Sequence, residues 1–266
     1  MKIRIAAARD CAWEPVFVKA EAGDWVRSAA LADGRVFPAQ ARAGGAVVLL
    51  TARAGEVLEM ELSDREMMPN VELARGANRA DVLIGGALFA AYQYDPAVAK
   101  PYLGPILAPD GTGFTRLDLS ASEHPHQRSV ICAGGDVGGV DFWNEYGNFG
   151  YQRHREFVEW TEGPAYASLA ANLDWEDASG AKYLREVRKF TFYNQPADCR
   201  YVDFETTFFA DFGEVRFGAT KEAGPLGIRV ADFIRADRGG AMVNAQGARG
   251  EAECWGKSSE YCIYTG

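Results

Sequence analysis

Apolar and polar side chains alternate with a period of two along much of the C-terminal half of the chain, which is the pattern of β-strands that bury one face. The clearest alternating segments are residues 166–175, 183–193 and 201–210. In the last of them one face would carry Val202, Phe204, Thr206 and Phe208. Turn-forming residues at 176–180 and 194–198 connect the three segments over short distances. We therefore predict three antiparallel strands that are neighbours in one sheet.

Shorter strand signals fill the N-terminal part of the chain. Residues 15–18, 46–51 and 57–62 have strand-like patterns, and glycine-bearing turns separate them. Short strands at regular spacing with such turns are typical of a small β-sandwich. A polar stretch that runs up to Pro69 marks the boundary. The sequence thus predicts a small N-terminal β-sandwich-like region over residues 1–66 and a large antiparallel domain over residues 70–266.

The larger domain opens with a predicted hairpin. Residues 81–84 and 88–92 are strand-like and flank Gly85-Gly86, a pair that favours a tight turn. Residues 151–160 fit either a short helix or a strand, and no segment has the pattern of a long amphipathic helix. The predicted fold class is therefore all-β and mostly antiparallel, with a large β-sandwich as its main part.

The composition argues against some partners. Of the 266 residues, 48% are hydrophobic and 24% are charged, which is enough apolar material for a packed core. The formal net charge is −9, from 28 basic and 37 acidic side chains, and no run of lysine or arginine occurs. An acidic chain of this kind repels phosphate backbones and anionic membrane surfaces. We therefore expect neither nucleic acid nor a membrane as a partner.

Cysteine usage and the N-terminal residues indicate a reducing compartment. The five cysteines are an odd number and form no Cys-x-x-Cys pair, and the start of the chain lacks the apolar run of a signal peptide. The longest apolar stretch, residues 82–92, is too short to span a bilayer. We predict a cytoplasmic protein with free thiols and no disulfide.

Two of the three histidines lie together in the segment Glu123-His124-Pro125-His126-Gln127-Arg128. Side chains two residues apart in an extended chain point to the same face, and Pro125 favours an extended conformation of His124. The two imidazoles would then act on one small volume as general acid or base, with Arg128 holding an oxyanion or carboxylate. Two other interpretations stay open. One is a metal site, which needs a third ligand; the other is a hydrogen-bonded loop without chemistry.

A glycine-rich stretch follows at residues 134–145. It does not fit a nucleotide-binding loop, because the GxGxxG spacing is absent and no helix follows. Asp141 and Asn144 offer hydrogen bonds and Trp143 offers a flat apolar face, a combination that suits the hydroxyl groups and the ring of a sugar. The alternative is an ordinary glycine-rich turn that places Trp143 in the core.

A third polar cluster occupies residues 218–229. It contains Lys221 beside Glu222 in a turn and ends with Arg229 after a short strand-like segment. Lys221 would supply a cation for substrate oxygens and Glu222 a general base. The alternative is a solvated turn, in which an ion pair contributes little.

These clusters belong to a series of motifs. In chain order the series is Lys100-Pro-Tyr-Leu-Gly-Pro105, His124-Pro-His-Gln-Arg-Ser129, Gly139-Val-Asp-Phe-Trp143, Thr220-Lys-Glu-Ala-Gly-Pro-Leu-Gly-Ile-Arg229, Trp255-Gly-Lys257 and Tyr264-Thr-Gly266. Over residues 70–266 it resembles a bacterial family of unknown function that is often labelled PmoA family, or methane oxygenase PmoA. The resemblance implies a sandwich similar to the galactose-mutarotase-like supersandwiches and a role in carbohydrate metabolism. It also implies a further strand-rich stretch after Tyr264-Thr-Gly266, which this sequence lacks.

We therefore expect a carbohydrate-active enzyme that acts on a sugar or keto-sugar derivative, and not a methane monooxygenase, whose membrane subunits need transmembrane helices. The predicted catalytic residues are His124, His126 and Glu222. The predicted substrate-binding residues are Arg128, Asp141, Trp143, Asn144, Lys221 and Arg229. We expect no cofactor and no bound metal, and a small carbohydrate as the partner. The alternatives are a non-catalytic sugar-binding module and a cupin-like metal-dependent enzyme that uses His124 and His126.

Overall fold

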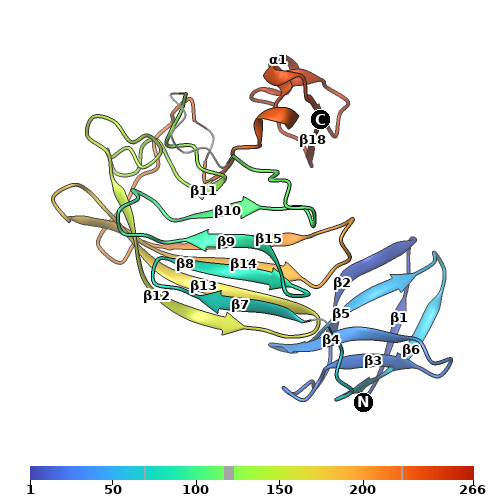
Figure 1. Cartoon of the computed structure of the whole chain (residues 1–266). Helices are drawn as coiled ribbons and strands as arrows, with labels where there is room; N and C mark the ends of the chain where they lie inside the picture. Colours follow the sequence, from blue (N-terminus) through green and yellow to red (C-terminus); the bar gives the residue numbers. More distant parts are fainter. Residues whose placement is uncertain (69, 117–122, 223) are drawn as a thin grey trace.

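The computed structural model describes residues 1–68, 70–116, 123–222 and 224–266, so that Pro69 at the predicted boundary lies outside the described residues. Strands and their connections make up most of the chain (Figure 1). Within the described residues, the pairings between named strands are antiparallel. The predicted fold class, all-β and mostly antiparallel, is confirmed.

The N-terminal strands are β1 (Lys2–Ala6), β2 (Cys11–Lys19), β3 (Ser28–Leu31), β4 (Val36–Arg42), β5 (Gly45–Ala52) and β6 (Val57–Ser63). They form a 6-stranded sheet in the order β1-β6-β3-β4-β5-β2. The first half of β4 pairs with β3 as far as Pro38, and the second half pairs with β5 from Ala39 onward. The sheet therefore folds over itself at Pro38 and encloses a core of its own, which includes Val26, Leu58 and Met60.

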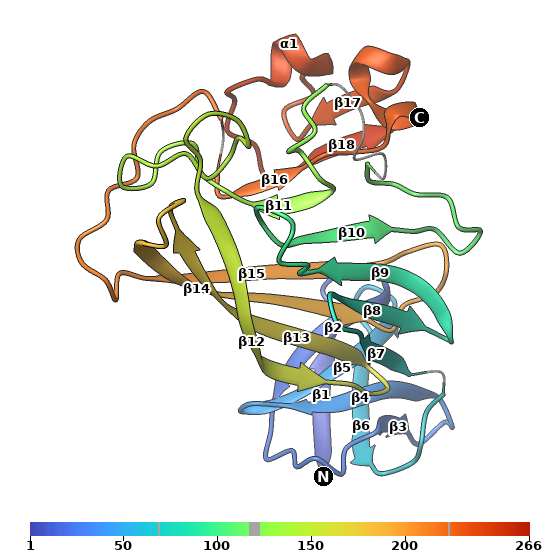
Figure 2. The ribbon, with the colours of Figure 1, turned by 60° about the vertical axis from the view of Figure 1, so that its left-hand side comes forward.

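The larger part of the chain is a sandwich of two sheets (Figures 1 and 2). One sheet has the order β16-β11-β10-β9-β8-β7 and the other β12-β13-β14-β15. The strands of the first are β7 (Val71–Arg75), β8 (Arg79–Ile84), β9 (Ala87–Gln93), β10 (Tyr102–Ile106), β11 (Val130–Cys132) and β16 (Leu226–Ile228). Those of the second are β12 (Tyr151–Thr161), β13 (Tyr166–Glu176), β14 (Lys182–Tyr193) and β15 (Val202–Phe209). The predicted hairpin at Gly85-Gly86 and the three neighbouring strands β13, β14 and β15 are confirmed.

The core lies between the two sheets. It combines side chains of β7, β8 and β9 with side chains of β13 and β14, and its large members include Tyr92, Leu103, Leu169, Phe190 and Phe192. The partly buried Val202 and Phe204 of β15 pack against it, on the face that the sequence predicts. Residues 151–160, for which a helix and a strand were both open, form most of β12, because their side chains pack against this core.

A charged pair is buried inside the sandwich. Glu186 and Arg188 lie on the inward face of β14, with 0% and 1% of their side chains exposed, and Arg188 Nε donates to Glu186 Oε1 at 2.7 Å. Arg188 also donates to the side-chain oxygen of Gln152 at 2.8 Å and to the carbonyl oxygen of Pro101 at 2.9 Å. Trp175 Nε1 donates to Glu186 at 2.7 Å. The pair therefore links both sheets and fixes the chain next to Lys100, where β10 begins.

The N-terminal sheet joins the sandwich through Gln40. The buried side-chain oxygen of Gln40 accepts hydrogen bonds from the backbone N–H groups of Ala165 and Tyr166, each at 3.2 Å. A Cβ atom at Gly163 would lie 2.4 Å from that oxygen, so glycine is needed for the close approach. Val47 and Leu49 of β5 share a small apolar cluster with Tyr166 and other sandwich residues, which extends the junction.

The last part of the chain lies beyond β11 and β16, at the other end of the molecule from the N-terminal sheet (Figures 1 and 2). It contains the 3-10 helices η1 (Asp232–Ile234) and η2 (Ala236–Arg238), strand β17 (Ala241–Asn244), helix α1 (Gly250–Cys254) and strand β18 (Cys262–Thr265). The strand-like end of the sequence thus pairs with β17. Among the described residues, the structure contains no helix long and apolar enough to cross a membrane.

Candidate functional site

Long connections of the first sheet carry the polar clusters that the sequence singles out. The histidine segment precedes β11, and the glycine-rich stretch lies between β11 and β12. Lys100, at the end of the connection from β9, precedes β10, which pairs directly with β11. Neighbouring strands therefore bring these connections to one region of the sheet, where their side chains meet. Long irregular connections on a rigid sheet are a common location for functional side chains.

The histidine segment is a turn and not the extended chain that we expected. His124 has φ +48°, in the left-handed region that histidine enters more readily than most side chains. The N–H of Gln127 donates to the carbonyl oxygen of His124 at 3.0 Å, which closes a β-turn with Pro125 at its second position, a favoured place for proline. The turn still brings the two imidazole rings together, with centroids 5.9 Å apart. The predicted proximity is present, but its cause is the turn.

Next to this turn lies an ion-pair group formed by Lys100, Arg128 and Glu145. Lys100 Nζ donates to Glu145 Oε1 at 2.6 Å, and Arg128 donates through both terminal nitrogens, with Nη2 at 2.6 Å from Glu145 Oε2. The exposed side-chain fractions are 1% for Lys100, 14% for Arg128 and 15% for Glu145. Two cations thus converge on one carboxylate in a largely water-excluded place, where such hydrogen bonds are strong.

The three charged groups modify one another. Burial opposes the ionisation of Glu145, but the hydrogen bonds from Arg128 and Lys100 outweigh it and hold the pKa of Glu145 below its ordinary value. Burial lowers the pKa of Lys100, and Glu145 only partly offsets that effect. One carboxylate faces two basic groups, so the group carries an excess of positive charge whenever Lys100 is protonated.

His126 lies beside this group and is buried, with 5% of the residue exposed. Burial and the charge of Lys100 lower the pKa of His126 below its ordinary value, so the imidazole is neutral at pH 7. His124, by contrast, has half of its side chain exposed. The ring of Tyr146, itself exposed, lies 6.2 Å from the ring of His126 at a steep angle. A neutral imidazole and an accessible second imidazole are thus adjacent, an arrangement that acid/base chemistry can use.

A small cavity of about 100 Å³ lies against the same strands. Arg128, Trp143 and Arg229 line it, together with residues of β11 and β16. A Cβ atom at Gly227 would lie 2.9 Å from the Trp143 ring, so this glycine leaves room for the indole. The cavity holds only a few heavy atoms, less than the about 300 Å³ of typical ligand pockets. The predicted substrate-binding residues Arg128, Trp143 and Arg229 are therefore brought together.

Asp141 and Asn144 use their hydrogen bonds locally. Asp141 Oδ1 accepts from the N–H of Trp143 at 2.8 Å and from the N–H of Asn144 at 3.0 Å, and Asp141 Oδ2 accepts from the Asn144 side-chain amide at 2.8 Å. These bonds shape the turn that presents Trp143. Their predicted contact with substrate stays a prediction.

Glu123 holds the C-terminal side of the site in place. Its carboxylate lies 3.2 Å from Arg229 and from Arg235, and 3.7 Å from Arg238. Hydrogen bonds from Arg235 and Arg229 lower the pKa of Glu123 to about 2. Arg229 also donates to the side chain of Gln127 at 3.2 Å. Arg229 is therefore largely engaged within the protein.

Lys221 and Glu222 precede β16, which pairs with β11. Leu226 pairs with Cys132 and Ile228 with Val130, so the chain before β16 leaves the pair at the end opposite to the chain before β11. Lys221 is 83% exposed, and its Nζ lies 3.7 Å from Glu222. Across the ranges that the structure describes, no hydrogen bond, ion pair or ring contact joins either residue to the histidines. Their predicted roles as cation and opposing base stay predictions.

Sequence reasoning missed Lys100 and Glu145 as site residues. Lys100 opens the Lys-Pro-Tyr-Leu-Gly-Pro motif, and Glu145 ends the glycine-rich stretch. Lys100 lies in a motif of the series and Glu145 follows the Gly139–Trp143 motif by two residues, so their positions were a usable signal. For the metal alternative, no group of three or more histidine, cysteine or acidic side chains with the geometry of a metal site occurs among the described residues.

Comparisons with known proteins identify a family but no activity. The model of a family described as a family of unknown function (DUF6807) matches residues 79–266. This range starts at β8 and covers most of the sandwich, the candidate site and the C-terminal elements. No curated protein and no solved structure matches the chain.

Proposed function

Because this chain belongs to the DUF6807 family of unknown function, its site has to be interpreted from its own chemistry, and we propose a carbohydrate-active enzyme that uses general acid/base catalysis. The substrate would be a sugar or keto-sugar derivative. The observation that carries the proposal is the buried, neutral His126 beside the exposed His124 and the Lys100–Glu145–Arg128 group. Perturbed titratable side chains that gather around a partly open site are typical of catalytic centres.

The two histidines take different roles in this proposal. His126 is neutral at pH 7 and accepts a proton from a sugar carbon or hydroxyl group. His124 is exposed and exchanges protons with solvent or with the opposite side of the substrate. Lys100, when protonated, and Arg128 favour negative charge that develops on a substrate oxygen, since their single carboxylate partner leaves them an excess of positive charge.

Aromatic side chains supply the apolar part of sugar recognition. Trp143 and Arg128 line the small cavity, which has room for a substituent of the sugar but not for the whole ring. Tyr146 is 67% exposed and lies beside His126, so its ring is free to stack on a pyranose face. The ring of the sugar would lie outside the cavity, over the two histidines.

Proton transfer at carbon can be followed without knowledge of the full reaction. We would incubate sugars and keto-sugars with the protein in deuterium oxide and record deuterium incorporation and new anomeric signals by NMR. Thermal-shift screening with and without divalent metal selects the compounds, since a bound ligand raises the unfolding temperature. The proposal expects exchange by the wild type and a rate about 10²–10⁴-fold lower for His126→Ala, the usual contribution of one acid/base group.

Matched variants separate chemistry from folding. Exogenous imidazole should partly restore His126→Ala, which a purely structural role would not allow. Glu222→Gln tests the opposing base: a loss comparable to that of His126→Ala, with unchanged thermal unfolding, would support that role. Sugar binding without turnover that is lost in Trp143→Ala and kept in His126→Ala would instead favour the non-catalytic sugar-binding module. Full exchange activity in His126→Ala would refute the acid/base proposal.

A further inference from the structure

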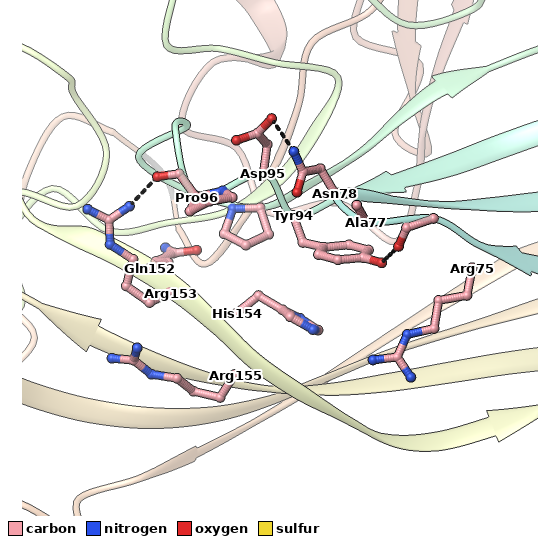
Figure 3. A pocket seen from close by; sticks show the side chains of 12 residues that line it. Arg75, Ala77, Asn78, Tyr94, Asp95, Pro96, Gln152, Arg153, His154 and Arg155 are labelled. Atoms are coloured by element: carbon pink, nitrogen blue, oxygen red, sulfur yellow. Dashed lines mark hydrogen bonds between the residues drawn. The ribbon is translucent and has the colours of Figure 1, made fainter.

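A second and larger cavity, of about 540 Å³, opens between β12 and the ends of β7 and β9 (Figure 3). Its walls include Arg75, Asn78, Tyr94, Asp95, Arg153 and His154. None of its lining residues lines the small cavity at Trp143. Its size falls in the range of about 300–1,000 Å³ that small-molecule sites occupy.

A β-bulge in β12 shapes the floor of this cavity. His154 pairs with Leu173 and Glu156 pairs with Asn172, so Arg155 is an extra residue in the strand. The bulge places both His154 and Phe157 on the inward face, with ring centroids 4.6 Å apart. Bulges re-aim side chains in this way and are frequent beside functional sites. Tyr94, which directly follows β9 of the opposite sheet, covers His154, with ring centroids 4.5 Å apart.

His154 has an unused polar atom at this floor. Its Nδ1 is buried and has no hydrogen-bond partner among the described residues. Burial, and to a smaller extent Arg75, lower the pKa of His154 to about 4, so the ring is neutral at pH 7. Buried polar atoms almost always have a partner, and a group of a bound ligand would supply the one that the described residues do not. A hydroxyl group fits whichever tautomer is present, since it both donates and accepts.

Arg75 is the unpaired cation of the cavity. It lies at the end of β7, and its guanidinium carbon is 4.9 Å from the centre of the Phe157 ring. No carboxylate in the described parts of the chain pairs with it. Arg155, in contrast, binds Asp174 and Glu176, and Arg153 binds Glu176 and the carbonyl oxygen of Pro96. In Figure 3 the guanidinium groups of Arg153 and Arg155 lie on one side of His154, and that of Arg75 lies on the other side.

Arginines outnumber carboxylates in the lining, although two of the three arginines are paired with Asp174 and Glu176. The chain has a net charge of −9, yet the lining contains the arginines 75, 153 and 155 and one carboxylate, Asp95. Asp95 is held by the side-chain amide of Asn78 at 2.9 Å and by the N–H of Ala97 at 2.8 Å. Because Glu176 and Asp174 compensate the charges of Arg153 and Arg155, an anionic ligand would pair with Arg75, which has no carboxylate partner among the described residues.

We infer that this cavity binds a small hydroxylated organic anion, such as a sugar acid or a sugar phosphate. Its carboxylate or phosphate would pair with Arg75, one hydroxyl group would satisfy Nδ1 of His154, and the remaining hydroxyl groups would face Asn78 and Asp95 at the rim. The site does not depend on the acid/base cluster at His126, so either proposal can fail alone.

Isothermal titration calorimetry on the full chain tests the site with four probes: glucuronate, glucose 6-phosphate, neutral glucose and inorganic phosphate. Glucuronate or glucose 6-phosphate should bind, and glucose should bind at least tenfold more weakly. Arg75→Gln should weaken binding at least tenfold. Arg4→Gln, which makes the same charge change on an exposed side chain of β1, should leave the affinity within twofold of the wild type.

NMR signals of the three histidines locate the bound probe. The ring signal of His154, assigned with His154→Gln, should shift on binding, whereas those of His124 and His126 should stay unchanged. Absence of binding by both anionic sugars, unchanged affinity in Arg75→Gln, or shifts confined to His126 would overturn the inference. Inorganic phosphate that binds as tightly as glucose 6-phosphate would overturn the assignment to a hydroxylated anion.

Discussion

Replacement of Arg188 by methionine should destabilise the sandwich strongly. The guanidinium is 1% exposed and neutralises Glu186, which is fully buried. Methionine fills a similar volume but leaves a carboxylate without a counter-charge in the core. Breaking a buried ion pair from one side costs about 3–5 kcal/mol in free energy of unfolding. For a unit of this size that corresponds to an unfolding temperature lower by roughly 6–20 °C.

The same substitution also removes hydrogen bonds that neighbouring groups need. The carbonyl oxygen of Pro101 and the side-chain oxygen of Gln152 each lose a charged donor. A double variant, Glu186→Leu with Arg188→Met, removes the unpaired carboxylate as well and should recover part of the lost free energy of unfolding. It should not recover all of it, because Trp175 Nε1 then lacks its acceptor, a deficit of about 1–3 kcal/mol.

Urea denaturation followed by circular dichroism measures these effects, with the single variants, the double variant and the wild type compared at one pH. Arg4→Met provides the control, because Arg4 and Glu59 form an exposed pair at 3.8 Å that should contribute less than about 1 kcal/mol. A free energy of unfolding for Arg188→Met within about 1 kcal/mol of the wild type would show that Glu186 is not an uncompensated charge and would refute the reasoning.

Three further outcomes are expected. Folding lowers the pKa of His154 from 6.5 to about 4, so between these pH values the unfolded chain binds more protons than the folded one. The free energy of unfolding should therefore fall as the pH drops from 6.5 toward 4. Denaturant titrations across this range should show a less steep fall for His154→Gln than for the wild type. Gln40→Leu leaves two buried N–H groups of the sandwich without an acceptor and should lower the free energy of unfolding by about 2 kcal/mol or more in denaturant titrations, whereas an unchanged value would show that the junction does not need Gln40. All five cysteines are free, so a thiol reagent should titrate five groups after denaturation and react first with the exposed Cys262 in the native protein; fewer than five under non-reducing conditions would contradict this.

The sequence was most informative where strands are long and regular. β13, β14 and β15 are neighbours along the chain and in space, so local periodicity was enough to predict both the strands and their order. Periodicity was less informative for β14 itself, because its inward face carries Glu186 and Arg188 as well as Leu184 and Phe190. From sequence alone, charged residues in a strand are assigned to the solvent-facing side, because their partners in space are not known.

The candidate site was predicted only in part, because its residues meet through long-range pairing. β11 and β16 have three residues each, too few for a periodic signal. The contact of Lys100 with Glu145 depends on the pairing of β10 with β11 and on the course of the next connection, which no local pattern specifies. The conformation of His124 was predicted incorrectly, since the segment forms a turn closed by the hydrogen bond from the N–H of Gln127 to the carbonyl oxygen of His124, and not the extended chain that Pro125 favours.

The pairing of β11 with β16 also has a kinetic consequence. Val130 pairs with Ile228, far along the chain, whereas a short hairpin connects β13 to β14. Closing a loop of about 100 residues costs about 2–3 kcal/mol more in chain entropy than closing a loop of about five. The meander should therefore form early and the strands beside His126 late. Pulsed hydrogen exchange during refolding should show the amides of β14 protected before those of β16. The part of the molecule that would do chemistry is thus assembled late, and each newly made chain would pass through a partly folded and inactive stage.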